Sequence, residues 1–329
     1  MRLVCPDGEP QYRRLLDPAQ LARLRADGHE LEWFDHAPGS DEGWIERLGR
    51  AEGALLLWRL PPGVLPRCPA VRAISFVGTG VESYVEMEEA RAGRVTVCNV
   101  PRYGENAVAE HALGLALAVA RRIPAGDGAV RQGTWEQTGG LELRGRRLGV
   151  VGAGPIGRRM IDLGRALGMA VICWTRHRSP ERERELGVPL VELDELFASA
   201  DVVSLHLAHR PETEGLVDRR LLSLLAPHAI LVNTARGALV DEQALAELLA
   251  AGAIRGAGLD VLGTEPPPQD HPLLSAPNVV VTPHVGFHTA EASGELLRVA
   301  LENLLRFARG EPQNVRTPER RAAASWRPR

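Results

Sequence analysis

The chain of 329 residues contains no lysine, so all 39 of its basic residues are arginine. With 42 acidic residues the formal net charge is −3, which argues against the basic surface of a nucleic-acid-binding protein. Because arginine carries every positive side-chain charge here, a single arginine says less about function than usual. The longest apolar run, residues 112–120, is far too short to cross a bilayer. We therefore expect no nucleic-acid partner and no membrane partner.

Cysteine is also scarce: the four residues form no C-x-x-C pair and no His/Cys cluster at metal spacing. Cys98 and Cys173 lie in apolar runs typical of strands, which predicts buried thiols and a reducing cytoplasm. The chain starts with a short strand-like segment, not with the charged and long apolar regions of a signal peptide. These absences predict a cytoplasmic enzyme without a bound metal ion.

Residues 147–157, Arg-Leu-Gly-Val-Val-Gly-Ala-Gly-Pro-Ile-Gly, predict a buried strand that leads into a glycine-rich turn and a helix. Gly152, Gly154 and Gly157 occupy the G-x-G-x-x-G positions, which serve the tight turn, the approach of backbone to a pyrophosphate, and helix packing. Pro155 suits the first helical turn, whose free N–H groups attract phosphate. A turn without a ligand is the alternative. The amphipathic helix and the next strand favour a dinucleotide.

The end of that next strand departs from the usual NAD pattern. An NAD site has Asp or Glu there to bind the ribose 2′-hydroxyl. This chain has Thr175, Arg176 and Arg178 instead, and a hydroxyl and a guanidinium can bind a 2′-phosphate. Ordinary surface arginines are the alternative. The sequence thus favours NADP(H), with NAD(H) possible.

The fold class predicted from the element pattern is α/β with two Rossmann-like domains. A doubly wound parallel-sheet dinucleotide-binding domain, residues 101–288, is inserted into a flavodoxin-like substrate domain, residues 1–100 and 289–329. Such an insertion creates a cleft between domains, where ligands commonly bind. Residues 310–329, rich in arginine and proline, are predicted to form an arm or a partly disordered end.

Individual elements are predicted from the period of the apolar residues. The predicted strands are 2–5, 30–34, 54–58, 71–76, 95–98, 148–151, 170–174, 188–191, 202–207, 229–233, 256–261 and 279–282. The predicted helices are 18–26, 41–48, 82–92, 104–121, 155–167, 192–199, 219–225, 241–251 and 290–309.

Three loops at predicted strand ends carry a complementary set of side chains, Arg236, Glu265 and His284. Residues just past the carboxyl ends of strands face the ligand in such sheets. Arg236 can bind a substrate carboxylate or carbonyl, and His284 can protonate a carbonyl oxygen while a hydride reaches the carbon. Glu265 can orient the imidazole and favour its protonated form. Singly, each could be an ordinary turn or surface residue; together they predict an active site.

These motifs resemble those of the D-isomer-specific 2-hydroxyacid dehydrogenase family over nearly the whole chain. The matching segments are 151–157, Asn233-Thr-Ala-Arg-Gly237, Gly258-Leu-Asp-Val-Leu262 with Glu265-Pro266, Thr282-Pro-His284, and Asn99-Val-Pro101 with Val108-Ala-Glu-His111. The resemblance implies that Arg236, Glu265 and His284 are catalytic, that Asp260 contacts the nicotinamide amide, and that the protein is a homodimer built around the dinucleotide domain. The glyoxylate and hydroxypyruvate reductase branch looks similar at residues 174–176.

The resemblance also implies a substrate-binding loop in the first domain. Its backbone donors are Gly78, Thr79 and Gly80, with a plain tight turn as the alternative. The residues that follow, 82–84, depart from the family pattern. Arg59 and Arg102 are candidates for binding a second anionic group of the substrate, such as a carboxylate, phosphate or phosphonate.

The predicted cofactor contacts come from several parts of the second domain. They are Val108, Gly152, Gly154, Pro155, Ile156, Gly157, Thr175, Arg176, His206, Thr213, Thr234, Ala235, Asp260 and Gly286. The loop at 208–210 either adds His209 or Arg210 to a 2′-phosphate site or is simply exposed.

The sequence therefore predicts an enzyme that reduces a small 2-oxo acid to the (R)-2-hydroxy acid with NAD(P)H. The handedness comes from the resemblance alone. Oxidation of phosphite at the same site is one alternative. Another is a dinucleotide-sensing regulator with little turnover. A formate dehydrogenase would need features that are missing around the glycine loop.

Overall fold

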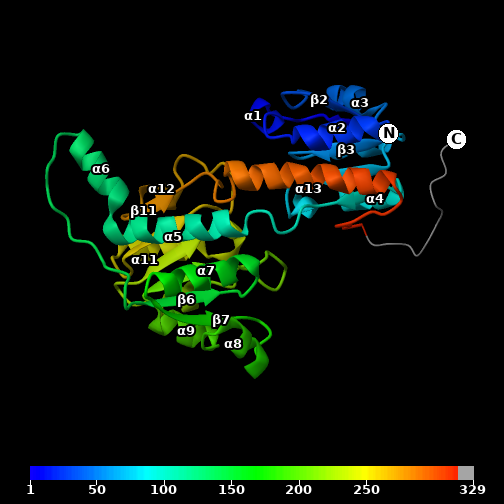
Figure 1. The fold of residues 1–329 in the computed structure, drawn as a ribbon. Helices are drawn as coiled ribbons and strands as arrows, with labels where there is room; N and C mark the ends of the chain where they lie inside the picture. The colour runs from blue at the N-terminus through cyan, green and yellow to red at the C-terminus, as the bar shows by residue number, and fades with distance from the viewer. Residues whose placement is uncertain (318–329) are drawn as a thin grey trace. The chain divides into compact units, whose positions relative to one another are not determined.

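A computed structural model describes residues 1–317 of the chain, and the last part of the predicted C-terminal arm, 318–329, lies outside the described residues. Two compact units divide the chain (Figure 1). Unit 1 comprises Met1–Tyr103 and the chain from Thr289 onward, and unit 2 is Gly104–His288. Each unit contains its own parallel sheet covered by helices, which confirms the predicted α/β class.

The sheet of unit 1 has five parallel strands in the order β2-β1-β3-β4-β5. This is the flavodoxin-like order, with β3 at the centre and the switch point between β1 and β3. The strands β3 and β4 are buried along their whole length, as expected where helices cover both faces of a parallel sheet. The strands are β1 Arg2–Cys5, β2 Glu30–Trp33, β3 Gly53–Leu56, β4 Ala73–Phe76 and β5 Thr96–Cys98.

The helix α13 (Ala290–Ala308) packs on β3 and β4 of unit 1 (Figure 1). Its leucines enter the core, and the fully buried side chain of Asn303 donates to Ser75 Oγ at 3.1 Å and to the carbonyl of Asn99 at 2.9 Å. These bonds satisfy polar atoms that would otherwise be costly to bury. The remaining helices of this unit are α1 Pro10–Arg13, α2 Pro18–Ala26, α3 Asp41–Leu48 and α4 Met87–Ala92, with short 3₁₀ turns at Leu65–Arg67 and Val81–Ser83.

One carboxyl group, that of Asp7, is completely buried just after β1. Its oxygens accept hydrogen bonds from the N–H groups of Leu57 (3.2 Å) and Trp58 (2.7 Å). Burial raises the pKa of Asp7 from 3.8 to about 6, because these two bonds and the group's own backbone N–H only partly offset the loss of water.

Asp7 is expected to make the stability of the protein depend on pH. The folded state binds the proton more tightly, so the free energy of unfolding falls as pH rises from the unfolded pKa, near 4, through the folded pKa of about 6. The rise in pKa corresponds to a loss of roughly 3 kcal/mol over that window. Urea unfolding of the wild type and of Asp7→Asn from pH 4 to pH 7 measures it. Identical slopes for the two proteins would contradict the expectation.

The sheet of unit 2 has six parallel strands in the order β11-β10-β9-β8-β6-β7. The direction in which the chain adds strands reverses between β6 and β8, and this switch point is where doubly wound sheets bind ligands. The glycine turn follows β6, and His206 follows β8. The strands are β6 Arg147–Val151, β7 Ala170–Trp174, β8 Val202–Leu205, β9 Ile230–Asn233, β10 Gly256–Leu259 and β11 Val279–Val281.

The long helix α5 (Glu105–Arg121) lies beside α7 and covers β9 and β10 (Figure 1). Two glycines of β10 allow this close approach: a Cβ at Gly258 would lie 2.8 Å from Leu115 Cβ, and one at Gly256 would lie 2.7 Å from Val119 Cγ1. The helix is therefore part of the core of unit 2. The other helices are α6 Ile123–Arg131, α7 Pro155–Ala166, α8 Pro180–Leu186, α9 Leu193–Ser199, α10 Arg219–Leu222, α11 Glu242–Ala250 and α12 Pro272–Ser275.

Two predictions about elements are wrong, and four helices were missed. The strand predicted at 188–191 is reduced to a single parallel bridge between Cys173 and Leu190, since Pro189 has no N–H to donate. The helix predicted at 82–92 is a 3₁₀ turn followed by α4, which begins only at Met87. The helices α1, α6, α8 and α12 were not predicted. In residues 1–317, none of the helices combines the length and the apolar character needed to span a bilayer.

Candidate active site

Arg236 stands on a turn that Asn233, the last residue of β9, holds in place. The buried side chain of Asn233 accepts from the N–H of Ala235 at 3.0 Å and donates to the carbonyl of Arg236 at 2.8 Å. The Arg236 guanidinium donates to the carbonyl of Ala235 at 2.6 Å, and the side chain is otherwise exposed. The turn thus presents the Arg236 guanidinium with further N–H donors that can bind a ligand.

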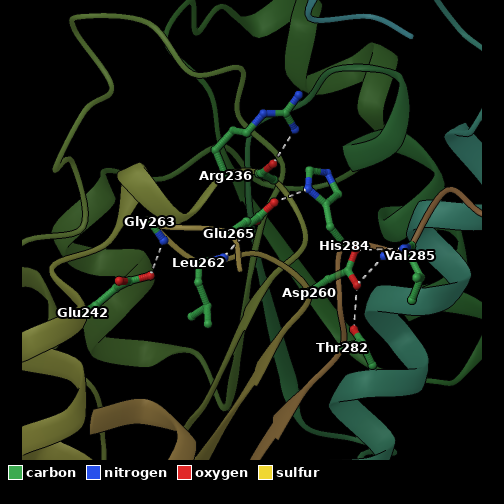
Figure 2. Close-up of polar contacts among 11 residues, drawn as sticks. Arg236, Glu242, Asp260, Leu262, Gly263, Glu265, Thr282, His284 and Val285 are labelled. Atoms are coloured by element: carbon green, nitrogen blue, oxygen red, sulfur yellow. Dashed lines mark hydrogen bonds and ion pairs between the residues drawn. The ribbon is translucent and has the colours of Figure 1, made fainter. Parts of the chain in front are cut away.

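The loop that carries Glu265 packs directly against this turn. A Cβ at Gly237 would lie 2.0 Å from the carbonyl carbon of Leu262, so only glycine permits the contact. Glu242, at the start of α11, accepts from the N–H of Gly263 at 2.8 Å (Figure 2). The loops after β9 and β10 are therefore locked together.

Glu265 and His284 form the central pair of the site (Figure 2). Glu265 Oε2 lies 2.7 Å from His284 Nδ1, and Oε1 accepts from the N–H of Leu262 at 3.1 Å. Burial alone would raise the pKa of Glu265, but the hydrogen bond and charge of His284 and the charge of Arg236 outweigh it and lower the pKa. Glu265 therefore stays ionised beside the imidazole. The bond through Nδ1 leaves Nε2 of His284 for chemistry.

His284 adopts an unusual backbone conformation, with φ of 54° in the left-handed region. Asp260, at the end of β10, supports it: the carbonyl of Asp260 accepts from the N–H of His284 at 2.8 Å. The carboxylate of Asp260 accepts from the N–H groups of Val285 (2.9 Å) and Gly286 (2.8 Å) and from the Thr282 hydroxyl (2.6 Å). Burial would raise the pKa of Asp260, but these bonds and His111 lower it, so the carboxylate is ionised. The sequence indicates no separate role for His111 or Thr282. The structure places both side chains in the hydrogen-bond network of Asp260.

The glycine turn after β6 fits a dinucleotide. A Cβ at Gly152 would lie 2.5 Å from the carbonyl oxygen of His206, and one at Gly157 would lie 1.9 Å from that of Gly152, so both are required by packing. Gly154 is exposed, and a Cβ there would meet no protein atom within 4 Å. Thr234 Oγ1 is buried without a hydrogen-bond partner in residues 1–317, as expected of an atom that binds a ligand. The glycine turn and the Thr234 hydroxyl together suit the dinucleotide that the glycine motif predicts.

His206 lies at the switch point with its Nε2 2.8 Å from Ser204 Oγ. Burial lowers the pKa of His206 to about 4, so its imidazole is neutral near pH 7. A neutral ring suits contact with a cofactor without adding a charge.

The end of β7 carries arginines that already have acidic neighbours. Arg176 lies 3.9 Å from Glu212, with both side chains more than half exposed, and Arg178 pairs with Glu192. Thr175 is partly buried. Sequence reasoning missed Arg182 of α8, which donates to the carbonyl of Ala153 in the glycine turn at 2.7 Å. No local sequence signal reveals that contact, because 29 residues separate the partners.

The other predicted cofactor residues of unit 2 are distributed around the same loops. The Thr213 hydroxyl closes a local turn: it has one proton to donate, and the carbonyl oxygens of Ala208 and Arg210 lie 2.9 and 3.1 Å away as its acceptors. His209 and Arg210 are exposed. Pro155 and Ile156 begin α7, Val108 is in the second turn of α5, Ala235 precedes Arg236, and Gly286 is held by Asp260.

The predicted substrate-binding residues belong to unit 1. Thr79 Oγ1 donates to the carbonyl of Val100 at 3.0 Å, and the N–H of Val100 donates to the carbonyl of Gly78 at 2.8 Å. Over residues 1–317, the N–H groups of Gly78, Thr79 and Gly80 donate to no protein acceptor. Arg59 is exposed and lies 3.4 Å from Glu86, and Arg102 has a left-handed backbone with φ of 61°.

The described part of the chain contains no group of three or more His, Cys, Asp or Glu residues that could hold a metal ion. The pair of Glu265 and His284 offers acid–base chemistry.

Comparison with known proteins gives consistent matches. Residues 113–286 match the family model described as D-isomer specific 2-hydroxyacid dehydrogenase, NAD binding domain. D-3-phosphoglycerate dehydrogenase of Mycobacterium tuberculosis is 40% identical over 282 residues, 84% of this chain and 52% of that protein. The chain thus spans about half the length of the mycobacterial relatives it matches.

Two further matches extend over nearly their full length. Glyoxylate reductase of Aeropyrum pernix is 37% identical over 295 residues, 86% of this chain and 88% of that protein. The solved structure of an acyclic imino acid reductase in complex with NADPH and D-Arg is 29% identical, with a TM-score of 0.81 over 96% of this chain and 99% of that one.

Proposed function

The chain belongs to the D-isomer-specific 2-hydroxyacid dehydrogenase family, and from this we propose that it reduces a small 2-oxo acid to the (R)-2-hydroxy acid with a nicotinamide dinucleotide. The observation that carries the proposal is the 2.7 Å pair of Glu265 and His284 beside Arg236, in the unit that also contains the glycine turn. The name of the glyoxylate reductase relative supports the substrate class.

Each catalytic residue has a role that follows from its contacts. Glu265 holds Nδ1 of His284 and stabilises the imidazolium. His284 donates the proton from Nε2 to the substrate carbonyl oxygen and takes it back in the reverse direction. Arg236 pairs with the substrate carboxylate or polarises the carbonyl through its remaining N–H donors.

The cofactor, when bound, supplies the hydride. In this proposal the N–H groups after Gly154 hold the pyrophosphate, and Thr234 Oγ1 and Ala235 contact the nicotinamide half. The neutral His206 and the backbone at Gly286 complete the surroundings. The carboxylate of Asp260 retains acceptor capacity for the nicotinamide amide beside its own loop bonds.

For the substrate we propose the loop Gly78, Thr79 and Gly80 as the carboxylate-binding element, since its three N–H groups are not used within the described chain. Arg59 and Arg102 are proposed to bind a second anionic group. Arg59 already has Glu86 as a neighbour, so an anionic group would have to compete with that carboxylate.

We propose NADP(H) as the favoured cofactor because no acid stands at the end of β7. Arg176 is expected to bind the 2′-phosphate in place of its weak, solvent-exposed pair with Glu212. Arg176→Ala should therefore weaken NADPH binding about tenfold and leave NADH binding unchanged. Glu212→Gln is the matched variant and should tighten NADPH. Fluorescence titration measures both, and equal loss for the two cofactors would refute the role of Arg176.

The proposed reaction is tested with purified protein, NADPH or NADH, and a panel of acids: glyoxylate, hydroxypyruvate, phenylpyruvate, 2-oxoisocaproate, oxaloacetate and phosphonopyruvate. Oxidation of cofactor with one acid supports the proposal. Preference for oxaloacetate or phosphonopyruvate points to recognition of a second anionic group. Binding of cofactor without turnover on any acid would favour a sensing role instead.

We further propose a homodimer and a cytoplasmic location. Three large apolar side chains on and after α6 are exposed: Ile123 (56%), Val130 (51%) and Trp135 (84%). Exposing apolar side chains of this size to water is unfavourable, and their exposure suits burial against a second copy of the chain. Sedimentation analysis reads the mass directly.

The four cysteines are buried free thiols, which fits a reducing compartment such as the cytoplasm.

A further inference from the structure

A histidine outside the catalytic pair, His111 of α5, reaches the loop that carries His284. Its Nε2 lies 2.9 Å from Thr282 Oγ1 and 3.4 Å from Asp260 Oδ1. The side chain is 26% exposed, whereas that of Asp260 is only 2% exposed. His111 thus links the long core helix of unit 2 to the end of β11 and to a buried carboxylate.

The direction of these hydrogen bonds follows from counting protons. The Thr282 hydroxyl has one proton, and it donates that proton to Asp260 Oδ1 at 2.6 Å. Thr282 can therefore only accept from His111, so Nε2 of His111 carries a hydrogen. The chain of donation runs from His111 to Thr282 to Asp260. Replacing His111 by an apolar residue would leave the hydroxyl without its donor.

Asp260, at the end of that chain, holds the backbone on both sides of the catalytic histidine. Its carbonyl accepts from the N–H of His284, and its carboxylate accepts from the N–H groups of Val285 and Gly286. These bonds span the residue whose φ is 54°, a conformation that costs free energy for any residue but glycine. A side chain that fixes the Asp260 carboxylate therefore also fixes the direction of the imidazole.

The packing around the loop leaves little room for an alternative arrangement. A Cβ added at Gly286 would lie 2.9 Å from Asp260 Oδ2 and 3.4 Å from His111 Cδ2. A side chain at position 286 would therefore lie too close to the Asp260 carboxylate and would contact the His111 ring.

We propose that His111 is a positioning residue for His284, which it acts on through Thr282 and Asp260. This inference rests on the proposed function, because the group that His111 positions, His284, is the proton donor of that reaction. His111 does not transfer the proton. It keeps the donor in its productive orientation by anchoring the loop to α5.

Two pairs of variants separate this role from packing. His111→Leu removes the donor, whereas His111→Gln keeps an N–H at similar reach; Thr282→Val and Thr282→Ser do the same for the hydroxyl. His111→Leu should lower kcat about 10- to 100-fold at saturating substrate, with KM for the cofactor unchanged, since small misplacements of a catalytic group carry such penalties. His111→Gln should recover most of the rate. Glu110→Ala, on the exposed side of the same helix, serves as the control.

The double variant His111→Leu/Thr282→Val supplies a stricter test. If the two residues act along one path, the double variant should be no slower than the slower single variant. The solvent isotope effect on kcat should also rise in His111→Leu, because proton transfer from a misoriented imidazole becomes more rate-limiting. A residue that only fills space would leave the isotope effect unchanged.

A readout that needs no substrate keeps this inference apart from the proposed reaction. Amide hydrogen exchange at His284, Val285 and Gly286 should speed up about tenfold or more in His111→Leu and in Thr282→Val, and stay near wild type in His111→Gln. Faster exchange in a protein that reduces no 2-oxo acid would sink the proposed function and leave the positioning of the loop standing. Unchanged exchange, or equal impairment of the Leu and Gln variants, would overturn the role of His111.

Discussion

His284→Ala is expected to lower kcat for reduction of the 2-oxo acid by about 10²- to 10⁴-fold, the usual contribution of a positioned general acid. The physical reason is that the carbonyl oxygen would have to take its proton from water while the hydride arrives. Glu265 Oε2 has its hydrogen bond from His284 Nδ1, so the variant also leaves that oxygen without its partner. Steady-state kinetics with the preferred acid measure the loss.

Cofactor binding should survive the same substitution. The glycine turn and Thr234 lie on other strand ends, and none of their hydrogen bonds or close contacts involves the imidazole of His284. NADPH affinity, measured by fluorescence, is therefore expected to stay within about threefold of wild type, less than 1 kcal/mol. His284→Ala with normal turnover would exclude the proposed mechanism, and one that no longer binds cofactor would reveal a wider collapse of the loop.

The apolar period, and not the capping residues, decided which helices could be predicted from the sequence. The bounds of α2 and α3 were predicted to the residue, and in the structure Asp17 and Ser40 cap these helices with side-chain oxygens that accept from N–H groups of the first turn. The helix α8 has an equally good Ser179 cap and a proline at its first turn. It was missed because its charged residues show no apolar period, so an argument from periodicity alone passed over it.

The alternation of short apolar runs and helical patterns was enough to predict two parallel sheets. The ends of the strands were harder, since apolar residues continue past the last ladder bond, as in 202–207, where β8 ends at Leu205. The reduced strand at 188–191 reflects proline chemistry that the apolar pattern does not encode.

The catalytic residues of the site could be predicted from short sequence motifs, whereas the long-range contacts that support them could not. Arg236, Glu265 and His284 stand in short motifs at strand ends, where position alone indicates a role. The partners of Asp260 could not be predicted: 171 residues separate His111 from Thr282, and 22 separate Thr282 from Asp260. Such contacts depend on how a helix packs on a sheet. Gly258 of β10 stands in a segment that matches the family, but that segment does not indicate which residues of α5 lie against it.

Arg236→Ala is expected to lower kcat/KM for the 2-oxo acid by about 10²- to 10³-fold, the effect of removing one positioned donor of charge-assisted hydrogen bonds. The Asn233 side chain and the glycine contact at Gly237 shape the turn independently of the guanidinium, so the backbone should persist in the variant. KM should rise and kcat should fall, because the same cation binds the substrate in the ground state and the negative charge that develops in the transition state.

Arg236→Lys provides the matched control for charge against geometry. Lysine keeps the positive charge but loses the planar fork that grips a carboxylate through two parallel bonds. If bidentate binding matters, the lysine variant should recover less than about a tenth of the lost kcat/KM, whereas near-complete recovery would mean that charge alone suffices. Loss of the Arg236 cation should also relieve one of the influences that lower the pKa of Glu265, so the pH at which Glu265 protonates should rise in Arg236→Ala and less in Arg236→Lys. A pH titration of Glu265 that is the same in all three proteins would mean that Arg236 does not act on the Glu265 and His284 pair, and its role would then be confined to the substrate.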